Sequence, residues 1–274
     1  MKRLLFIIFL VSVVLLAGNS LVLANGIPDY LYEGFESGSI PCDWKKAGKV
    51  DTTNQNPISG IYSAYMDTSN GTEAAVQDMC SFMVSKAVAP QYVPKNVRVY
   101  FLVKYATKEP DDEIYEAPNN LSKVREDPFT VELLILNSSE MKSVDLVTIK
   151  TDGITPGPNT TVVGYDTGIS YVPPVHTPFG DRAEGVHTPF GDRAEGEGTR
   201  TSPVLRVDTT LLYNSCDPVS IKFSICDWWD KDDTSTAYID DVKIEFDYPD
   251  QRTISKKGHP LIINQLIPCP GPAI

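Results

Sequence analysis

Nine short runs of β-branched and alternating residues follow one another without helical periodicity, and no other feature constrains the fold as strongly. The clearest run, NVRVYFLVKYAT at residues 96–107, places an apolar residue at every second position from Val97 to Val103. The other expected strands are residues 28–36, 61–68, 80–88, 129–137, 142–151, 202–212, 219–229 and 236–246. Consecutive short strands with turn-like separators are typical of an antiparallel β-sandwich or barrel. We therefore predict one all-β domain over residues 25–250.

Residues 152–201 interrupt this rhythm, because they are rich in Gly, Pro, Thr and charge. Within them the sequence VHTPFGDRAEG occurs twice in succession, at 175–185 and 186–196. His176 and His187 fall in the two copies and could suggest a metal site, but a duplication in an exposed loop that tolerates insertion is the simpler interpretation. We predict a long disordered loop or lid over 152–201 and a C-terminal tail over 251–274.

The first 24 residues have the layout of a secretory signal peptide: a basic start at Lys2 and Arg3, a long apolar run, and the small or apolar residues VLA before a polar NG. The alternative is an uncleaved membrane anchor, since the apolar run is long enough to span a bilayer. No second run of that length follows, so we expect a secreted or cell-surface protein with no membrane span after cleavage.

An acidic balance limits the partners. The formal charge of −12 would become −14 once Lys2 and Arg3 are removed. Nucleic acid requires clustered Lys and Arg, so it is not expected as a partner. A negative surface favours solubility and suits divalent cations.

The five cysteines are Cys42, Cys80, Cys216, Cys226 and Cys269, an odd number that leaves at least one free or paired between chains. Cys216 and Cys226 flank one expected strand, which would hold them roughly 33 Å apart. A disulfide needs Cα atoms within about 7 Å, so these two should not pair with each other. Cys42 and Cys80 could pair, although nothing in the sequence requires it.

Three segments carry a family resemblance by their order along the chain. The stretch from Phe35 to Trp44 fits the pattern F-E-x-G-x-x-P-x-x-W, residues 59–64 read SGIYSA, and residues 239–242 read IDDV. In this order they resemble the secreted jelly-roll domains called cleaved-adhesin, MAM-like and choice-of-anchor. The segments 105–113, 126–134 and 221–242 are similar to the middle and the ending of choice-of-anchor domains. The cysteine pattern of MAM domains is absent.

The resemblance implies an antiparallel jelly-roll β-sandwich, concanavalin-like or galactose-binding-like, with its first and last strands adjacent. It also implies a calcium site that joins Glu36 to Asp240 or Asp241. We expect a second calcium site where acids gather at the ends of neighbouring strands, drawn from Glu109, Asp127, Asp227 and Asp230. Ca²⁺ takes six to eight oxygen ligands in irregular geometry, which suits such clusters. A solvated acidic loop is the alternative.

Aromatic residues supply a possible sugar platform. Trp228 and Trp229 are adjacent, so they point to opposite faces of their strand, and one is expected in the core. The other could stack on a sugar ring together with Trp44 or Tyr248, although outward aromatic rings also pack under loops.

Catalytic signals are missing from the sequence. No GxSxG, HExxH or phosphate-cradling glycine loop occurs, and the three histidines lie in the duplicated loop and the tail. We therefore expect a non-catalytic, calcium-stabilised adhesion or recognition module that binds extracellular glycans or proteins. A structural component of a cell-surface or matrix layer and an accessory domain of a secreted hydrolase are the alternatives.

Overall fold

The structure is a computed structural model of the chain. It describes residues 29–68, 79–107, 114–116, 122–124, 128–137, 140–150, 153–165, 170–171, 200–227, 234–249, 253–256, 259–262 and 266–269. The expected signal peptide and both copies of the tandem duplication lie outside these residues. Among the described residues, no helix has the length and apolar character needed to cross a membrane.

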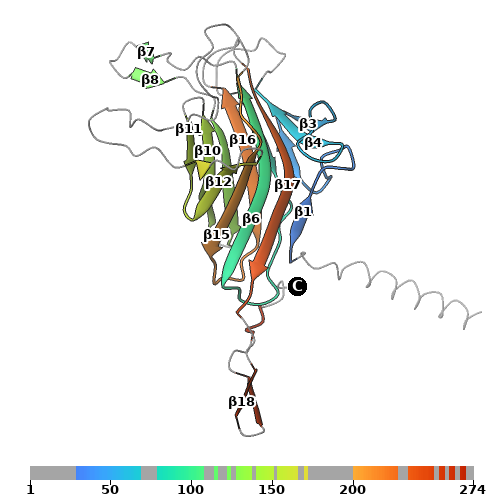
Figure 1. Cartoon of the computed structure of the whole chain (residues 1–274), viewed down its shortest axis with the longest axis vertical. Coiled ribbons are helices and arrows are strands. Elements are labelled where there is room, and N and C mark those ends of the chain that lie inside the picture. Colours follow the sequence, from blue (N-terminus) through green and yellow to red (C-terminus); the bar gives the residue numbers. More distant parts are fainter. Residues whose placement is uncertain are drawn as a thin grey trace, which may run out of the picture.

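Two antiparallel sheets face each other and form a sandwich (Figure 1). The larger sheet has the order β13-β12-β15-β6-β17-β4-β3, with β1 paired to β17 and β14 paired to β6. Its strands are β1 (Leu31–Glu33), β3 (Lys49–Thr53), β4 (Ser63–Asp67), β6 (Asn96–Thr107), β12 (Thr160–Gly164), β13 (Ser170–Tyr171), β14 (Arg200–Thr201), β15 (Leu205–Leu212) and β17 (Ser235–Asp247). We call it the nine-stranded sheet.

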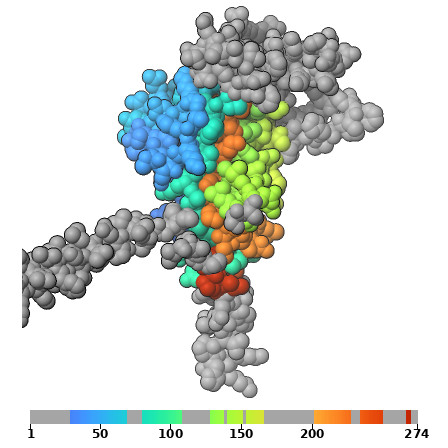
Figure 2. All heavy atoms as spheres, turned by 180° about the vertical axis from the view of Figure 1, so that it is seen from behind, coloured from blue at the N-terminus to red at the C-terminus, as the bar shows by residue number. Residues whose placement is uncertain are grey.

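The second sheet has the order β11-β10-β9-β16-β5-β2. Its strands are β2 (Lys45–Ala47), β5 (Met79–Val84), β9 (Phe129–Leu136), β10 (Met141–Lys150), β11 (Gly153–Pro156) and β16 (Val219–Asp227). Seen from behind, the yellow-green residues of β9 and β10 lie beside the orange of β16, and the blue N-terminal segment covers one flank (Figure 2). Two hairpins pair only with themselves: β7 (Ile114–Glu116) with β8 (Ser122–Val124), and β18 (Thr253–Lys256) with β19 (His259–Ile262).

The core lies between the sheets and follows from the period of two along each strand. In β6 the inward residues from Val97 to Val103 are fully buried, while Arg98 on the outer face is exposed. Phe101 of β6 meets Phe223 of β16 edge to face, with ring centroids 5.3 Å apart. Burying a large apolar side chain contributes about 1.5–3 kcal/mol, so these paired inner faces hold the sheets together.

These sheets confirm the predicted all-β jelly-roll sandwich. Each of the nine expected runs contains a strand, and β6 spans the predicted residues 96–107 without change. The expected strand over 28–36 is shorter, because β1 ends at Glu33 and Phe35 adopts a positive φ of 56°. Phe35 and Glu36 therefore belong to a turn. They do not lie on opposite faces of a strand, as an expected strand over 28–36 would have required.

The expected loop over 152–201 is partly wrong, because β11 and β12 occupy 153–156 and 160–164. β11 pairs with β10 in one sheet and β12 pairs with β15 in the other. The chain thus crosses between the sheets within a few residues, through a turn that contains Asn159 with a φ of 52°. Gly and Pro in this stretch serve a crossover turn rather than a long loop.

Two disulfides join segments distant in sequence: Cys80 with Cys226, and Cys216 with Cys269. The prediction that Cys216 and Cys226 do not pair with each other is confirmed. The possible Cys42–Cys80 bond is wrong, because Cys80 lies directly across from Cys226 in the β5–β16 ladder. Cys42 is the unpaired cysteine and is exposed.

Candidate functional site

A bulge in β17 lies at the centre of the site. The register between β17 and β6 runs from Asp240 opposite Leu102 to Lys243 opposite Tyr100, so β17 carries one more residue than β6 between these pairs. Asp241 takes up the extra residue with a positive φ of 48°. At the other edge of β17 the partner changes at this point from β4 to β1. A bulge re-aims side chains and bends its strand, which here turns two consecutive carboxylates toward one junction.

Hydrogen bonds hold Asp240 and Asp241 at this junction. Asp240 is fully buried and accepts hydrogen bonds from the Ser59 amide (3.0 Å) and the Ser63 hydroxyl (2.8 Å). Its Oδ1 also accepts a bond from the Asp241 amide at 2.8 Å. Asp241 accepts bonds from the Tyr32 hydroxyl at 3.0 Å and from the Ser59 hydroxyl at 3.4 Å. The donors come from β1, from the turn before β4, from the first residue of β4 and from β17 itself.

Glu36 joins the same junction from the turn after β1. Both of its carboxylate oxygens accept a bond from the Ile61 amide, at 3.1 and 3.0 Å. Gly60 has a φ of 56°, and a Cβ there would lie 2.0 Å from Glu36 Oε1. Glycine is therefore required at position 60 by both its backbone conformation and the close approach of the carboxylate. We call Glu36, Asp240 and Asp241 the carboxylate junction.

The negative charges of the junction act together on their neighbours. Burial raises the pKa of Asp240 above its ordinary value of 3.8, while the hydrogen bonds from Ser63, Ser59 and Asp241 oppose that rise. The hydrogen bond to Asp241 raises the pKa of the Tyr32 hydroxyl, and the charges of Asp241, Asp240 and Glu36 raise it further. No ion pair joins any of the three carboxylates to a Lys or Arg among the described residues. Their charge is met by neutral donors only.

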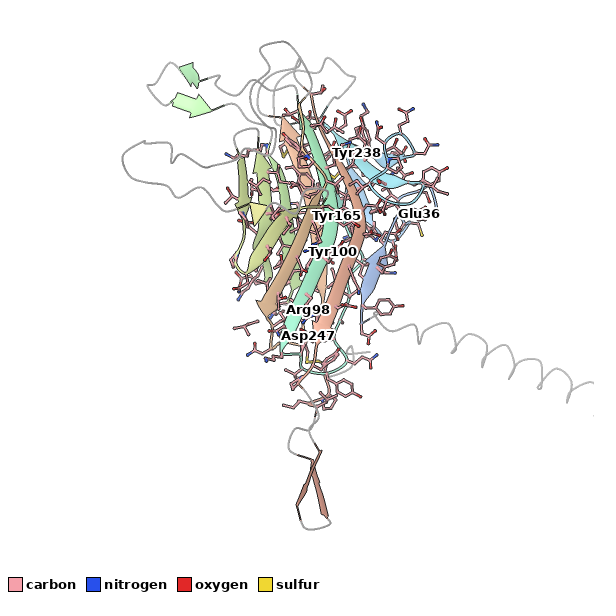
Figure 3. All side chains as sticks on the ribbon, in the orientation of Figure 1. Glu36, Arg98, Tyr100, Tyr165, Tyr238 and Asp247 are labelled. Atoms are coloured by element: carbon pink, nitrogen blue, oxygen red, sulfur yellow. A yellow bond between two sulfur atoms is a disulfide. The ribbon has the colours of Figure 1, made fainter. Side chains whose placement is uncertain are left out.

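A row of polar and aromatic side chains continues from the junction across the outer face of the nine-stranded sheet. Cross-strand register places Tyr32, Lys243, Tyr100 and Asp208 in one line over β1, β17, β6 and β15. Arg206 lies two residues before Asp208 on the same face, and Tyr165 follows β12. Figure 3 shows Tyr165 and Tyr100 on this face, with Glu36 at the flank. We call Tyr32, Lys243, Tyr100, Asp208, Arg206 and Tyr165 the tyrosine strip.

The outer tyrosines of the strip are exposed, and charged groups along the strip act on the tyrosine between them. Tyr32 is 60% exposed and Tyr165 is 56% exposed, whereas Tyr100 between them is half-buried. Desolvation is the main cause that raises the pKa of Tyr100, and the charge of Asp241 also raises it. Tyr165 and Asp208 act in the same direction and Arg206 in the opposite one. The Tyr100 hydroxyl therefore stays neutral and keeps a donor proton at physiological pH.

The structure brings together one predicted set of residues and separates another. Asp240 and Asp241 accept bonds from Ser59, and Glu36 accepts a bond from Ile61 in the same turn. The three carboxylates therefore lie around one turn, close to where β1 pairs with β17. The calcium site that the resemblance implied there stays a prediction. Trp44 is only 6% exposed and packs edge to face on Phe35, so its ring offers no free face to a sugar. Tyr248 lies beyond the end of β17, edge-on to Tyr92 and away from the strip.

Several predicted residues lie outside the described part of the chain. These are Glu109, Asp127, Asp230, Trp228 and Trp229, while Asp227 is described only through its backbone at the end of β16. The second calcium site stays a prediction. Among the described residues, no group of three or more His, Cys, Asp or Glu side chains is arranged to hold a metal ion. Glu36 is bound to a backbone amide rather than turned toward the two aspartates.

Sequence reasoning missed the tyrosine strip. One signal was present, because alternation in VRVYFLVKY assigns Arg98, Tyr100 and Lys104 to the face opposite the core valines. The row itself depends on register across β1, β17, β6, β15 and β12, and these pairings join residues far apart in sequence. The alternation of one strand cannot supply that register.

No known protein family and no curated protein matches this chain. Solved structures show a distant likeness. A cleaved-adhesin domain of Lys-gingipain from Porphyromonas gingivalis is 13% identical, with a TM-score of 0.38 over 80% of this chain and 98% of that one. The xylan-binding domain CBM22-2 from Paenibacillus barcinonensis is 9% identical, with a TM-score of 0.37 over 79% and 98%. TmCBM61, solved with β-1,4-galactotriose, is 11% identical, with a TM-score of 0.38 over 78% and 95%. The likeness assigns neither a family nor a ligand to this chain.

Proposed function

We propose that this chain is a non-catalytic recognition module of a secreted or cell-surface protein, and that it binds an extended glycan across the tyrosine strip. The observation that supports this most directly is the row of Tyr32, Lys243, Tyr100 and Asp208 across four neighbouring strands, with the exposed Tyr165 on the same face after β12. Tyrosine offers an apolar ring and a polar hydroxyl at once, which suits a sugar ring with its hydroxyl rim. Asp208 and Arg206 add an acceptor and a fork of donors beside the rings. The two disulfides agree with an oxidising, extracellular location.

A glycan array followed by calorimetry on the strongest ligand tests this proposal. Tyr165→Ala should weaken binding about tenfold, which corresponds to about 1.4 kcal/mol, because it removes an exposed ring without touching the core. Tyr100→Phe should weaken binding by a smaller factor, since it removes only the hydroxyl. Tyr30→Ala is the matched control, because Tyr30 is 61% exposed but lies off the strip.

Equal affinities of the wild type and Tyr165→Ala for that glycan would contradict the placement of the site on the strip. Release of shortened sugars during long incubation would contradict the non-catalytic assignment. A blank array together with self-association in solution would instead favour the structural component of a surface or matrix layer.

We also propose that the carboxylate junction binds Ca²⁺, with Asp240, Asp241 and Glu36 as carboxylate ligands. Carboxylate oxygens suit a hard cation, and none of these three side chains has a basic partner among the described residues. Glu36 would have to turn from the Ile61 amide toward the two aspartates to complete the site. Asp240 accepts three hydrogen bonds and Asp241 accepts two, so lone pairs remain on both. The ion would supply charge neutralisation at the point where β1, the turn before β4 and β17 meet. A comparison of Tm in calcium and in chelator tests this binding.

A further inference from the structure

An open pocket lies at the end of the sandwich, away from the tyrosine strip. Asp29 and Tyr30, which precede β1, and residues 245–248 at the end of β17 line its volume of about 390 Å³. That volume is at the lower end of the range for small-ligand pockets, about 300–1,000 Å³. It is far larger than a metal ion needs and suits one side chain or one sugar ring. We call Asp29, Tyr30, Glu245, Phe246, Asp247 and Tyr248 the pole pocket.

The walls of the pole pocket are aromatic and acidic. Tyr30 is largely exposed, and Tyr248 is held edge-on against Tyr92 with ring centroids 5.9 Å apart. The Tyr248 hydroxyl accepts a hydrogen bond from the Gln91 amide at 3.3 Å, which fixes the ring further. Aromatic faces beside carboxylates attract organic cations through the ring quadrupole and through direct charge.

Two of the three carboxylates already have partners. Glu245 pairs with Lys243 at 2.8 Å, and Asp247 pairs with Arg98 at 2.8 Å. Arg98 and Asp247 are labelled next to each other at the lower end of the sheet in Figure 3. Asp29 has no ion pair within the described part of the chain. Burial is the main cause that raises the pKa of the Tyr248 hydroxyl, and the charge of Asp29 raises it further. The pocket therefore has one negative charge left for a ligand. A single carboxylate without an ion pair suits one organic cation better than Ca²⁺, which takes six to eight oxygen ligands.

The surroundings of the pocket indicate a protein as the source of the cation. Leu212 is 82% exposed and Ile267 is 65% exposed, and Tyr30 is similarly open. Leu212 lies opposite Asn96, which lies opposite Asp247, so it is two strands or about 10 Å from the pocket wall. Large exposed apolar side chains around a charged cavity are typical of a protein-binding surface rather than of a sugar site.

The pocket wall is preorganised by the C-terminal segment. Cys269 is bonded to Cys216, and its amide donates to the Gln91 carbonyl at 2.9 Å. The Val93 amide donates to the Ile267 carbonyl at 2.8 Å. These bonds fix residues 91–93, which in turn hold Tyr248. A wall fixed before binding loses little entropy when a ligand enters.

We propose that the pole pocket receives an arginine side chain of a partner protein, with the guanidinium between the Tyr30 and Tyr248 rings and bound to Asp29. Arginine fits better than lysine because its planar group stacks on aromatic rings and bonds a carboxylate with two donors. This site is independent of the glycan proposal, since it uses no residue of the tyrosine strip.

Nuclear magnetic resonance titration of the isotope-labelled protein with N-acetyl-arginine amide tests the proposal. Saturable shifts are expected at the amides of residues 29–30 and 245–248 at millimolar concentrations. The citrulline counterpart, which has the same shape without the charge, should bind at least about tenfold more weakly. Asp29→Asn should weaken arginine binding by a similar factor, and Tyr30→Ala should also weaken it. Asp208→Asn is the matched control, because it removes the same charge from the tyrosine strip and should change nothing.

Three results would overturn the proposal: equal binding of the arginine and citrulline probes, shifts that map to other residues, or tighter binding of glucosamine than of arginine. Asp29→Asn and Asp208→Asn are then compared on the glycan ligand. If arginine binding fails but Asp208→Asn alone loses glycan binding, the arginine proposal is wrong and the glycan proposal stands. If Asp29→Asn alone loses arginine binding and Asp208→Asn keeps full glycan affinity, the glycan proposal is wrong and the arginine proposal stands.

Discussion

At the scale of single residues, the buried carboxylate of Asp240 makes a prediction about pH. Because its pKa is raised in the folded protein, the folded state binds a proton more tightly than the unfolded state between 3.8 and the raised value. Its contribution to stability is therefore complete below pH 3.8 and is lost as pH rises through the folded pKa. The quantity to compare is the unfolding free energy of the wild type minus that of Asp240→Asn, measured in chelator. It should fall as pH rises from 3.8 through the folded pKa, by at most about 1.4 kcal/mol per pH unit.

Urea unfolding of both proteins at a series of pH values between 3.5 and 8 would measure this difference. Asp51→Asn, which removes a carboxylate from an exposed position on β3, serves as the control for net charge. A difference between wild type and Asp240→Asn that does not change with pH would show that the Asp240 carboxyl is not perturbed by its burial. Added calcium at neutral pH should make the wild type more stable than Asp240→Asn, because only the wild type retains the full set of calcium ligands.

At the scale of elements, each of the two disulfides joins two distant segments, and the two bonds have different roles. Cys80–Cys226 crosses the β5–β16 ladder with a sequence separation of 146, and Cys216–Cys269 has a sequence separation of 53. By the chain-entropy model, removing them should cost about 5 and about 4 kcal/mol of unfolding free energy. We expect C80A/C226A to lose stability without losing arginine binding, and C216A/C269A to lose both. Unfolding curves and the arginine titration measure the two effects.

A thiol-reactive label provides the check on pairing. The native wild type should take up one label per chain, at the exposed Cys42. Labelling at any other cysteine, or intact arginine affinity in C216A/C269A, would contradict the role assigned to the second disulfide.

The elements also show what a sequence can predict. Alternation located the longer strands that bury one face, such as β6 and β17, but not the short β3, which buries only Val50. It missed β2, whose three residues Lys45–Ala47 are all exposed, because an edge strand without a buried face has no alternation to detect. It missed β11 and β12 because the Gly and Pro of their crossover turn dominate the local composition. The pairing of the first strand with the last was implied by the resemblance. The bulge at Asp241, and the bonds that Ser59 and Ser63 donate to Asp240, depend on long-range pairing that the resemblance did not supply.

At the scale of the whole molecule, the carboxylate junction joins the ends of the folded domain. The Tyr32–Asp241 bond spans 209 residues of sequence, and the Ser59–Asp240 bond spans 181. The chain has a formal charge of −12, and three of its carboxylates lie around this junction without a basic partner in the described structure. Their repulsion acts where these ends must close. A cation that binds only the closed junction therefore stabilises the entire sandwich and not one turn.

That reasoning predicts the size of the calcium effect. A ligand at about 100 times its Kd adds about 2.7 kcal/mol to the unfolding free energy. For a domain of this size each kcal/mol shifts Tm by about 2–4 °C, so saturating calcium should raise Tm by roughly 5–10 °C over chelator. Calorimetry in calcium, in magnesium at equal ionic strength, and in chelator measures it. Asp241→Asn and Glu36→Gln should abolish the calcium-specific shift, while Asp51→Asn should retain it. A Tm that is the same in calcium and in chelator would show that neutral donors alone close the junction and that no cation binds there.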